Sequence, residues 1–229
     1  MPEAIPVVIE ATTKRAFATA VDWPGWCRGG RDEAGALDAL VAYGPRYARV
    51  ADRAGVAFDA PDDVARFDVV ERLPGGAGTD FGAPGVQAAL EEAPLGGDER
   101  TRLEGLLAAG WVEFIAIAHG ARGHPLRKGP RGGGRELDAI VEHAVGAHEG
   151  YIRTLGGAAP RLGTVGEADL DPAVHALLQA TTAALDASER GELPAVGPRG
   201  GRRWPARFFI RYAAWHVLDH AWEVEDRVG

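Results

Sequence analysis

The chain has 229 residues, of which 46% are hydrophobic and 25% are charged, and its formal net charge at pH 7 is −8. This composition is typical of a globular protein with one large domain or two modest ones, and no apolar run of about 18 residues predicts a membrane span. The acidic balance argues against a partner bound through a nucleic-acid phosphate backbone.

Two further features of the sequence predict a cytoplasmic protein. The N-terminal residues lack the basic and apolar parts of a signal peptide. A single cysteine, Cys27, excludes a disulfide within one chain. Cys27 lies beside a Pro-Gly turn and could act as a nucleophile, but no histidine partner can be assigned to it, and an unreactive buried thiol is the commoner case.

Residues 1–75 are predicted to form a small α/β module. Three segments read as strands: residues 7–11, 16–21 and 67–73. The first two are joined by a short turn, so we expect them to pair as a hairpin.

A helix is expected between the second and third strands. Asp32 can cap a helix that begins near Glu33. Pro45 should interrupt this helix, so that residues 46–54 form a second one. The next segment, residues 76–97, is rich in Gly and Pro and reads as a linker or a functional loop.

Residues 98–229 have a helical character. Apolar residues recur there with the period of a helix, and Gly/Pro-rich loops separate the periodic stretches. Four helices are expected, near residues 99–119, 135–155, 171–189 and 204–227. The expected fold class is therefore α+β, with a C-terminal four-helix bundle that follows the small N-terminal module.

The last helix carries the most informative motif. His216 and His220 are four residues apart, which places both imidazoles on one face of the helix, one turn apart. Tyr212, Asp219 and Glu223 fall on or beside the same face. Two imidazoles so placed can hold one divalent metal if a third ligand comes from another helix; the alternative is a pair of hydrogen-bonded core histidines.

The second long helix offers two candidates for the third ligand. His143 and His148 are five residues apart and point about 140° away from each other, so both are not expected to bind one ion. The helical pattern places His148 in the middle of the apolar face and His143 at its edge. Periodicity alone therefore favours His148 as the buried histidine.

Three features of residues 98–229 resemble the DinB-like (YfiT-like) family: the Arg-rich segment 126–135, His143 followed by Tyr151, and the pair His216 and His220. The resemblance implies a four-helix bundle in which three histidines hold a metal, and it assigns His143, His216 and His220 as the ligands. His148 stands where many relatives carry Glu. The resemblance therefore leaves open that His148 joins or replaces His143.

The same resemblance implies a function that depends on a divalent metal. Some DinB-like proteins look like thiol transferases or isomerases that use a low-molecular-weight thiol, and others are assigned only as metal-dependent hydrolases. Both reactions imply a small-molecule substrate. Three imidazoles leave coordination positions open, as in catalytic sites, and zinc is the first expectation, with nickel, iron and manganese as alternatives. Members of the family often pair, so a homodimer is one assembly to expect.

Three side chains near the histidines are candidate catalytic groups: Asp219, Glu223 and His148. Either acid could orient a ligand imidazole or carry a proton, although a surface carboxylate is the commoner role of each. Five residues are candidates for substrate binding: Arg127, Arg131, Arg135, Tyr151 and Tyr212. The Arg-rich loop could bind an anionic thiol or a substrate carboxylate, or it could be a solvated connection between helices.

The N-terminal module loosely resembles HicB-like antitoxin domains, through its strand pair, the Asp-x-Pro-Gly sequence at residues 22–25 and the helix that follows. That resemblance implies a protein-binding role, whereas a module that packs on the bundle is the simpler interpretation. Two functions stay open: a metal-dependent enzyme, and a non-enzymatic metal- or ligand-binding protein whose N-terminal module recognises another protein.

Overall fold

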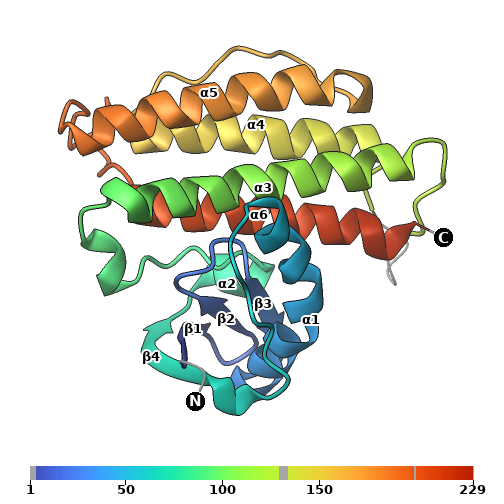
Figure 1. Cartoon of the computed structure of the whole chain (residues 1–229), viewed down its shortest axis with the longest axis vertical. Coiled ribbons are helices and arrows are strands. Elements are labelled where there is room, and N and C mark those ends of the chain that lie inside the picture. The colour runs from blue at the N-terminus through green and yellow to red at the C-terminus, as the bar shows by residue number, and fades with distance from the viewer. Residues whose placement is uncertain (1–3, 129–133, 199, 229) are drawn as a thin grey trace.

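The computed structural model describes residues 4–128, 134–198 and 200–228. Over these residues the chain has one four-stranded sheet and six α-helices, and the sheet lies below a layer of long helices (Figure 1). The predicted α+β class is therefore confirmed.

The sheet has the strand order β3-β2-β1-β4. Its strands are β1 (Ile5–Ala11), β2 (Ala16–Ala20), β3 (Cys27–Gly30) and β4 (Phe67–Pro74). β1 and β2 form the predicted antiparallel hairpin, β3 runs antiparallel to β2, and β4 runs parallel to β1. The sequence pattern did not predict β3, because its Arg-Gly-Gly segment has low β-propensity and becomes a strand only through pairing with β2.

α1 (Glu33–Arg53) packs against β2 and β3. The Asp32 carboxylate caps it as predicted, accepting a hydrogen bond from a backbone N–H of the first turn at 2.9 Å. The predicted break at Pro45 is wrong, because α1 continues through this residue. A proline removes one helical hydrogen bond, but Leu40 and Tyr47 on either side of it are fully buried, and their packing stabilises one continuous helix.

The long helices are α3 (Gly97–Ala121), α4 (Leu137–Leu155), α5 (Leu170–Glu189) and α6 (Ala206–Arg227). All four predicted helices are present, with ends that differ from the prediction by a few residues. They lie side by side, with α6 packed against α3 and α4, and α5 packed against the same two helices (Figure 1). Among the described helices α3 alone is long and apolar enough to cross a membrane, and half of its most apolar window is buried within the protein.

The Gly/Pro-rich segment before α3 is packed against α6. It contains α2 (Ala77–Phe81) and a short 3-10 turn (Ala89–Glu92). Glu91 in this turn is buried and forms an ion pair with Arg211 of α6. The segment that reads as a linker or loop is therefore anchored at its C-terminal half.

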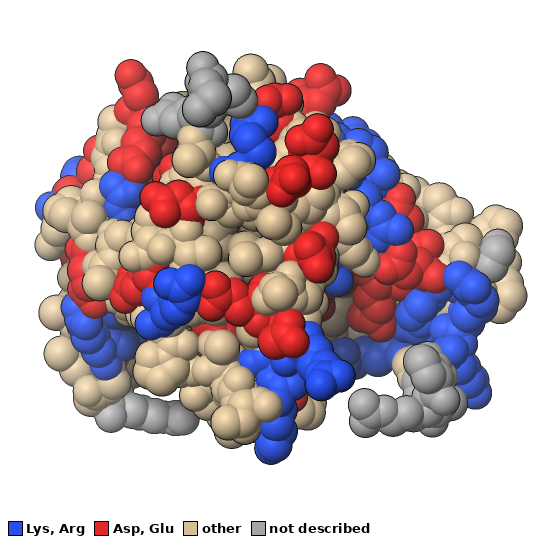
Figure 2. Space-filling model, turned by 90° about the horizontal axis from the view of Figure 1, so that it is seen from below, with Lys and Arg blue, Asp and Glu red and all other residues tan. Residues whose placement is uncertain are grey.

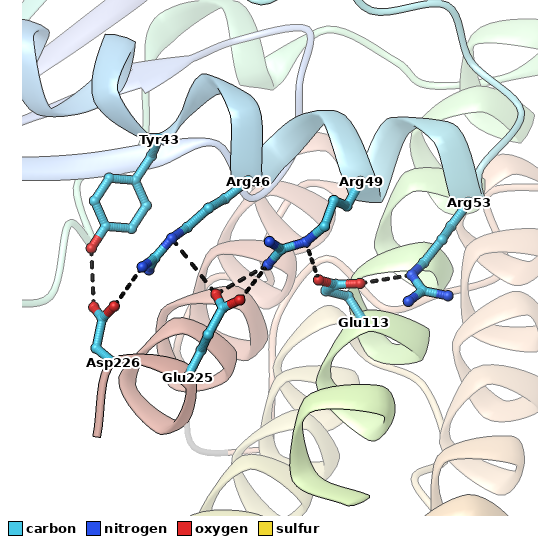
Figure 3. A network of polar contacts seen from close by, with 7 residues as sticks. All are labelled: Tyr43, Arg46, Arg49, Arg53, Glu113, Glu225 and Asp226. Carbon is cyan, nitrogen blue, oxygen red and sulfur yellow. Dashed lines mark hydrogen bonds and ion pairs between the residues drawn. The ribbon is translucent and has the colours of Figure 1, made fainter. Parts of the chain in front are cut away.

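A network of ion pairs joins α1 to α3 and α6 (Figure 3). Glu113 of α3 is buried and accepts hydrogen bonds from Arg49 Nε and Arg53 Nε, each at 2.7 Å. Arg49 also pairs with Glu225 of α6 at 2.9 Å. The network is completed by Tyr43, Arg46 and Asp226. A buried carboxylate is costly without its cations, so Glu113 favours the state in which the module is docked on the helices.

Candidate metal centre

Three histidines from α4 and α6 face one another. His216 and His220 lie one turn apart on α6, and His143 meets them from α4. The Nε2 atoms of His143 and His216 are 3.2 Å apart, and one ring nitrogen of each histidine lies within 4.8 Å of the others. The structure thus brings together the residues that the family resemblance assigns as ligands, which we call the histidine triad.

The triad nitrogens fit a divalent ion. Imidazole nitrogens bind zinc at about 2.0–2.1 Å, so two of them in a tetrahedral site lie about 3.4 Å apart. The separation of 3.2 Å between His143 and His216 is close to this value. His143 is partly exposed, whereas His216 and His220 are buried, so His143 is the triad member most accessible to solvent.

Two triad histidines are held in the neutral form. Burial lowers the pKa of His143 and lowers that of His216 further, and the neighbouring His220 adds to both shifts. A histidine binds a metal only when its imidazole is neutral. Both rings therefore have a lone pair available near neutral pH.

Glu223 holds the third ring in a defined tautomer. Its carboxylate accepts a hydrogen bond from His220 Nδ1 at 2.8 Å and also pairs with Arg227 at 2.8 Å. These contacts lower the pKa of Glu223, and the bond with His220 is the largest cause. Because Nδ1 carries the proton, Nε2 of His220 is left as the lone-pair atom, an arrangement found in most metal-binding histidines.

Aromatic side chains form a wall beside the triad. The ring centroids of Tyr151 and Trp215 lie 5.5 Å and 5.9 Å from that of His216. Tyr212 lies between these two rings, 5.2 Å from Tyr151 and 5.1 Å from Trp215. Burial raises the pKa of both tyrosines, so their phenols stay protonated near neutral pH. Both tyrosines predicted to bind substrate therefore lie beside the triad.

The structure does not bring His148 to the triad. His148 is buried in the helical core, where its Nδ1 accepts a hydrogen bond from Trp111 Nε1 at 3.3 Å. Its Nε2 lies 2.9 Å from Thr181 Oγ1, so it donates the remaining ring proton to that hydroxyl. Burial lowers the pKa of His148 to about 3. Periodicity correctly predicted its burial, but with both nitrogens engaged His148 is unsuited to the catalytic or ligand role considered for it.

Asp219, the other candidate catalytic acid, faces the N-terminal module. Its carboxylate pairs with Arg28 of β3 at 3.0 Å. The Arg28 guanidinium lies over the ring of Tyr43, 3.9 Å from its centroid. Arg28 was not predicted as a site residue, since it precedes Asp219 by 191 positions and belongs to the strand that the pattern missed.

The described part of the Arg-rich loop places Arg135 where its charge acts on the triad. Arg131 lies outside the described residues. Arg127 donates to a backbone carbonyl of the last turn of α6 at 2.6 Å, and its own carbonyl accepts from Arg227 at 2.8 Å. Arg135 is exposed, and its charge contributes to the lowered pKa of two triad histidines. Of the two predicted arginines that the structure describes, Arg135 is the one whose charge acts on the triad.

Cys27 does not behave as a nucleophile. It is buried, and it accepts a hydrogen bond from Thr19 Oγ1 at 3.0 Å. Burial raises the pKa of the thiol to about 12, so the thiolate is not populated near neutral pH.

No protein-family model matches the chain, and neither a curated protein nor a solved structure is significantly similar to it. The function must therefore be argued from the chemistry of the site.

Proposed function

We propose that the protein is a divalent-metal-dependent enzyme that acts on a small molecule, with His143, His216 and His220 as the metal ligands. The observation that carries the proposal is the convergence of three imidazoles, two of them with Nε2 atoms 3.2 Å apart. The hydrogen bond from His220 Nδ1 to Glu223 supports it, because a carboxylate behind a histidine is a common feature of metal sites. The arrangement of α3 to α6 is consistent with a DinB-like bundle.

Each residue around the triad has a separate role in such a site. A bound divalent ion would lower the pKa of a water or thiol that it binds. Glu223 orients His220, and Arg227 keeps the Glu223 carboxylate ionised. The phenols of Tyr151 and Tyr212 remain protonated and can donate hydrogen bonds to a substrate oxygen, while the aromatic wall limits the access of water.

Within this class we favour transfer that uses a low-molecular-weight thiol over hydrolysis. Attack by water is assisted by a general base, and the two candidate acids are already engaged, Glu223 by His220 and Arg227, and Asp219 by Arg28. A thiol has an ordinary pKa near 8.5, so metal binding alone can ionise it near neutral pH. The preference therefore rests on the smaller change that a thiol needs, because its ordinary pKa is far closer to neutral than that of water.

The alternative function, a binding protein with an antitoxin-like module, has weaker support. A module that recognises another protein should offer its surface freely, whereas α1 is held to α3 and α6 by the network around Glu113 (Figure 3). Arg28 of β3 is likewise used within the chain, at Asp219.

Metal analysis tests the proposal directly. The purified protein should contain or take up about one zinc, nickel or iron ion per chain, measured by mass spectrometry of the elements before and after chelation. His220→Ala should lose this ion, because it removes one of three ligands. His175→Ala, which removes an exposed histidine of α5, should keep it. Stoichiometric metal in the His220→Ala protein would refute the assignment of the triad.

Thiol binding is tested without knowledge of the substrate. The Co²⁺-loaded protein should develop a thiolate-to-metal charge-transfer band when a small thiol is added. If the protein holds stoichiometric cobalt but shows no such band at high thiol concentration, thiol transfer is rejected and hydrolysis becomes the proposed reaction.

A further inference from the structure

An open pocket of about 460 Å³ lies where the N-terminal sheet meets α6. Its lining includes four basic side chains, one carboxylate and one aromatic ring: Lys14, Arg15, Arg28, Arg31, Asp219 and Phe17. We call it the basic pocket. Its size lies in the range of small-molecule sites, which are usually about 300–1,000 Å³.

The charge of the basic pocket is opposite to that of the whole chain, whose net charge is −8. Lys14 pairs with Asp80 at 2.9 Å, and Arg28 pairs with Asp219 at 3.0 Å. Within the described part of the chain no carboxylate pairs with Arg15 or Arg31, and both are exposed. Basic and acidic side chains are interspersed over the face shown in Figure 2, with basic ones at its lower and right edges among other places. The basic pocket is therefore suited to an anion of small size.

The basic pocket borders the histidine triad through α6. Asp219 lies between His216 and His220 in the sequence, so its Cα is displaced along the helix axis by about 4.5 Å from the first and about 1.5 Å from the second. Phe17 belongs to a buried cluster with Trp215, and the Trp215 ring packs 5.9 Å from that of His216. The pocket and the triad thus both involve α6, and the packing of Phe17 with Trp215 connects the pocket to the ring beside His216.

We propose that the basic pocket binds the anionic group, a carboxylate or a phosphate, of the small molecule whose reactive end lies at the triad. The second half of this statement rests on the proposed metal-dependent function; the binding of an anion does not. The N-terminal module then has a defined role, since every basic residue of the pocket comes from it. Arg15 and Arg31 supply the charges that are not already paired, and Arg28 is fixed by Asp219 of α6 and by the ring of Tyr43.

The first test measures anion binding in the absence of metal. Inorganic phosphate and succinate are titrated by calorimetry into the metal-free protein and into its His220→Ala variant, and the better ligand distinguishes phosphate from carboxylate. The double substitution Arg15→Gln and Arg31→Gln should weaken binding at least about tenfold, because two charged donors are lost. Arg161→Gln, which removes an exposed charge before α5, should leave binding unchanged. No saturable binding, or equal binding in the double variant, would overturn the proposal.

The second test asks whether one ligand reaches both places. Mercaptohexanoate and the neutral mercaptohexanol are compared on the Co²⁺-loaded protein by the charge-transfer band of the bound thiolate. We expect the acid to bind at least about tenfold more tightly, and the advantage to disappear in the Arg15→Gln and Arg31→Gln double variant but not in Arg161→Gln. Equal affinities of acid and alcohol in the unmodified protein would refute a shared ligand.

The two tests separate this proposal from the proposed function. If neither the unmodified protein nor its variants bind metal but anion binding is retained, the metal-dependent enzyme is rejected and the pocket remains an anion site. Retained metal with no anion binding would reject the pocket and leave the enzyme.

Discussion

The buried histidine His148 and the histidine triad differ in what their ring nitrogens face. His148 is 2% exposed, and His216 and His220 are each 9% exposed, so burial alone does not distinguish them. Both nitrogens of His148 have hydrogen-bonding partners, Trp111 and Thr181. In the triad, the Nε2 atoms of His143 and His216 instead face each other at 3.2 Å, and a ring nitrogen of His220 lies beside them.

The proposed metal site rests on this difference between the two sets of ring nitrogens. A buried polar atom is normally satisfied by a partner within the protein, and His148 follows that rule. The triad is better explained by an ion that accepts three lone pairs, with Glu223 fixing one tautomer from behind. The predictions below test whether the two groups differ as this explanation requires.

The largest expected difference concerns the response of stability to metal. Zinc at about a thousandfold excess over its Kd should raise the free energy of unfolding by about 4 kcal/mol, because it binds only the folded protein. His216→Ala should lose this gain, since two histidines do not hold the ion. Thermal unfolding with and without zinc measures the effect, and His175→Ala serves as the control. An equal gain in the His216→Ala protein would remove the distinction between the triad and any other histidine.

His148→Ala should destabilise the protein and leave the metal in place. Removing a buried ring leaves a cavity and an unpaired indole N–H of Trp111, for a combined cost of about 2–4 kcal/mol in the free energy of unfolding. Urea unfolding measures the loss, and elemental analysis should still find one ion per chain. Thr181→Val, which removes only the hydroxyl partner, should cost about 1 kcal/mol. Loss of metal in the His148→Ala protein would mean that His148 belongs to the metal site.

These two groups also show what the sequence could predict. Spacing in one helix is a local property, so the pairing of His216 with His220 and the burial of His148 followed from the sequence. The choice of His143 as the third member depends on how α4 packs against α6. Periodicity within one helix gives no information on this packing, so the choice came from the family resemblance.

Contacts between distant segments lie beyond such local patterns. The pairing of Asp219 with Arg28 and the basic pocket join α6 to β3, whose Arg-Gly-Gly sequence carries no strand pattern. The continuous helix through Pro45 has the same origin, because tertiary packing overrides the local penalty of proline. The four long helices and the site residues on α4 and α6 were therefore predictable, whereas the neighbours that come from the N-terminal module were not.

Glu223→Gln should weaken the metal site without abolishing it. The amide keeps the size of the side chain but loses the charge that favours the Nδ1–H tautomer of His220. Loss of such a supporting group typically lowers metal affinity about ten- to hundredfold. Competition with a chelating dye measures the affinity, and Glu142→Gln, an exposed acid beside His143, is the control. Unchanged metal affinity in the Glu223→Gln protein would mean that the carboxylate pairs with Arg227 but does not support metal binding by His220.

The smallest expected effect is a difference in the pH dependence of stability in the metal-free protein. His148 has a pKa of about 3 in the folded state, while an unfolded histidine titrates near 6.5. Between these values the unfolded chain binds the extra proton, so stability falls as the pH is lowered, by at most about 1.4 kcal/mol per pH unit for one group. His148→Leu removes this group and should give a shallower fall between about pH 6 and pH 4, measured by urea unfolding in the presence of a chelator. His175→Ala should keep the original slope because that ring is exposed. Parallel curves for the unmodified and His148→Leu proteins would show that His148 is protonated in the fold, and the contrast with the triad would then rest on geometry alone.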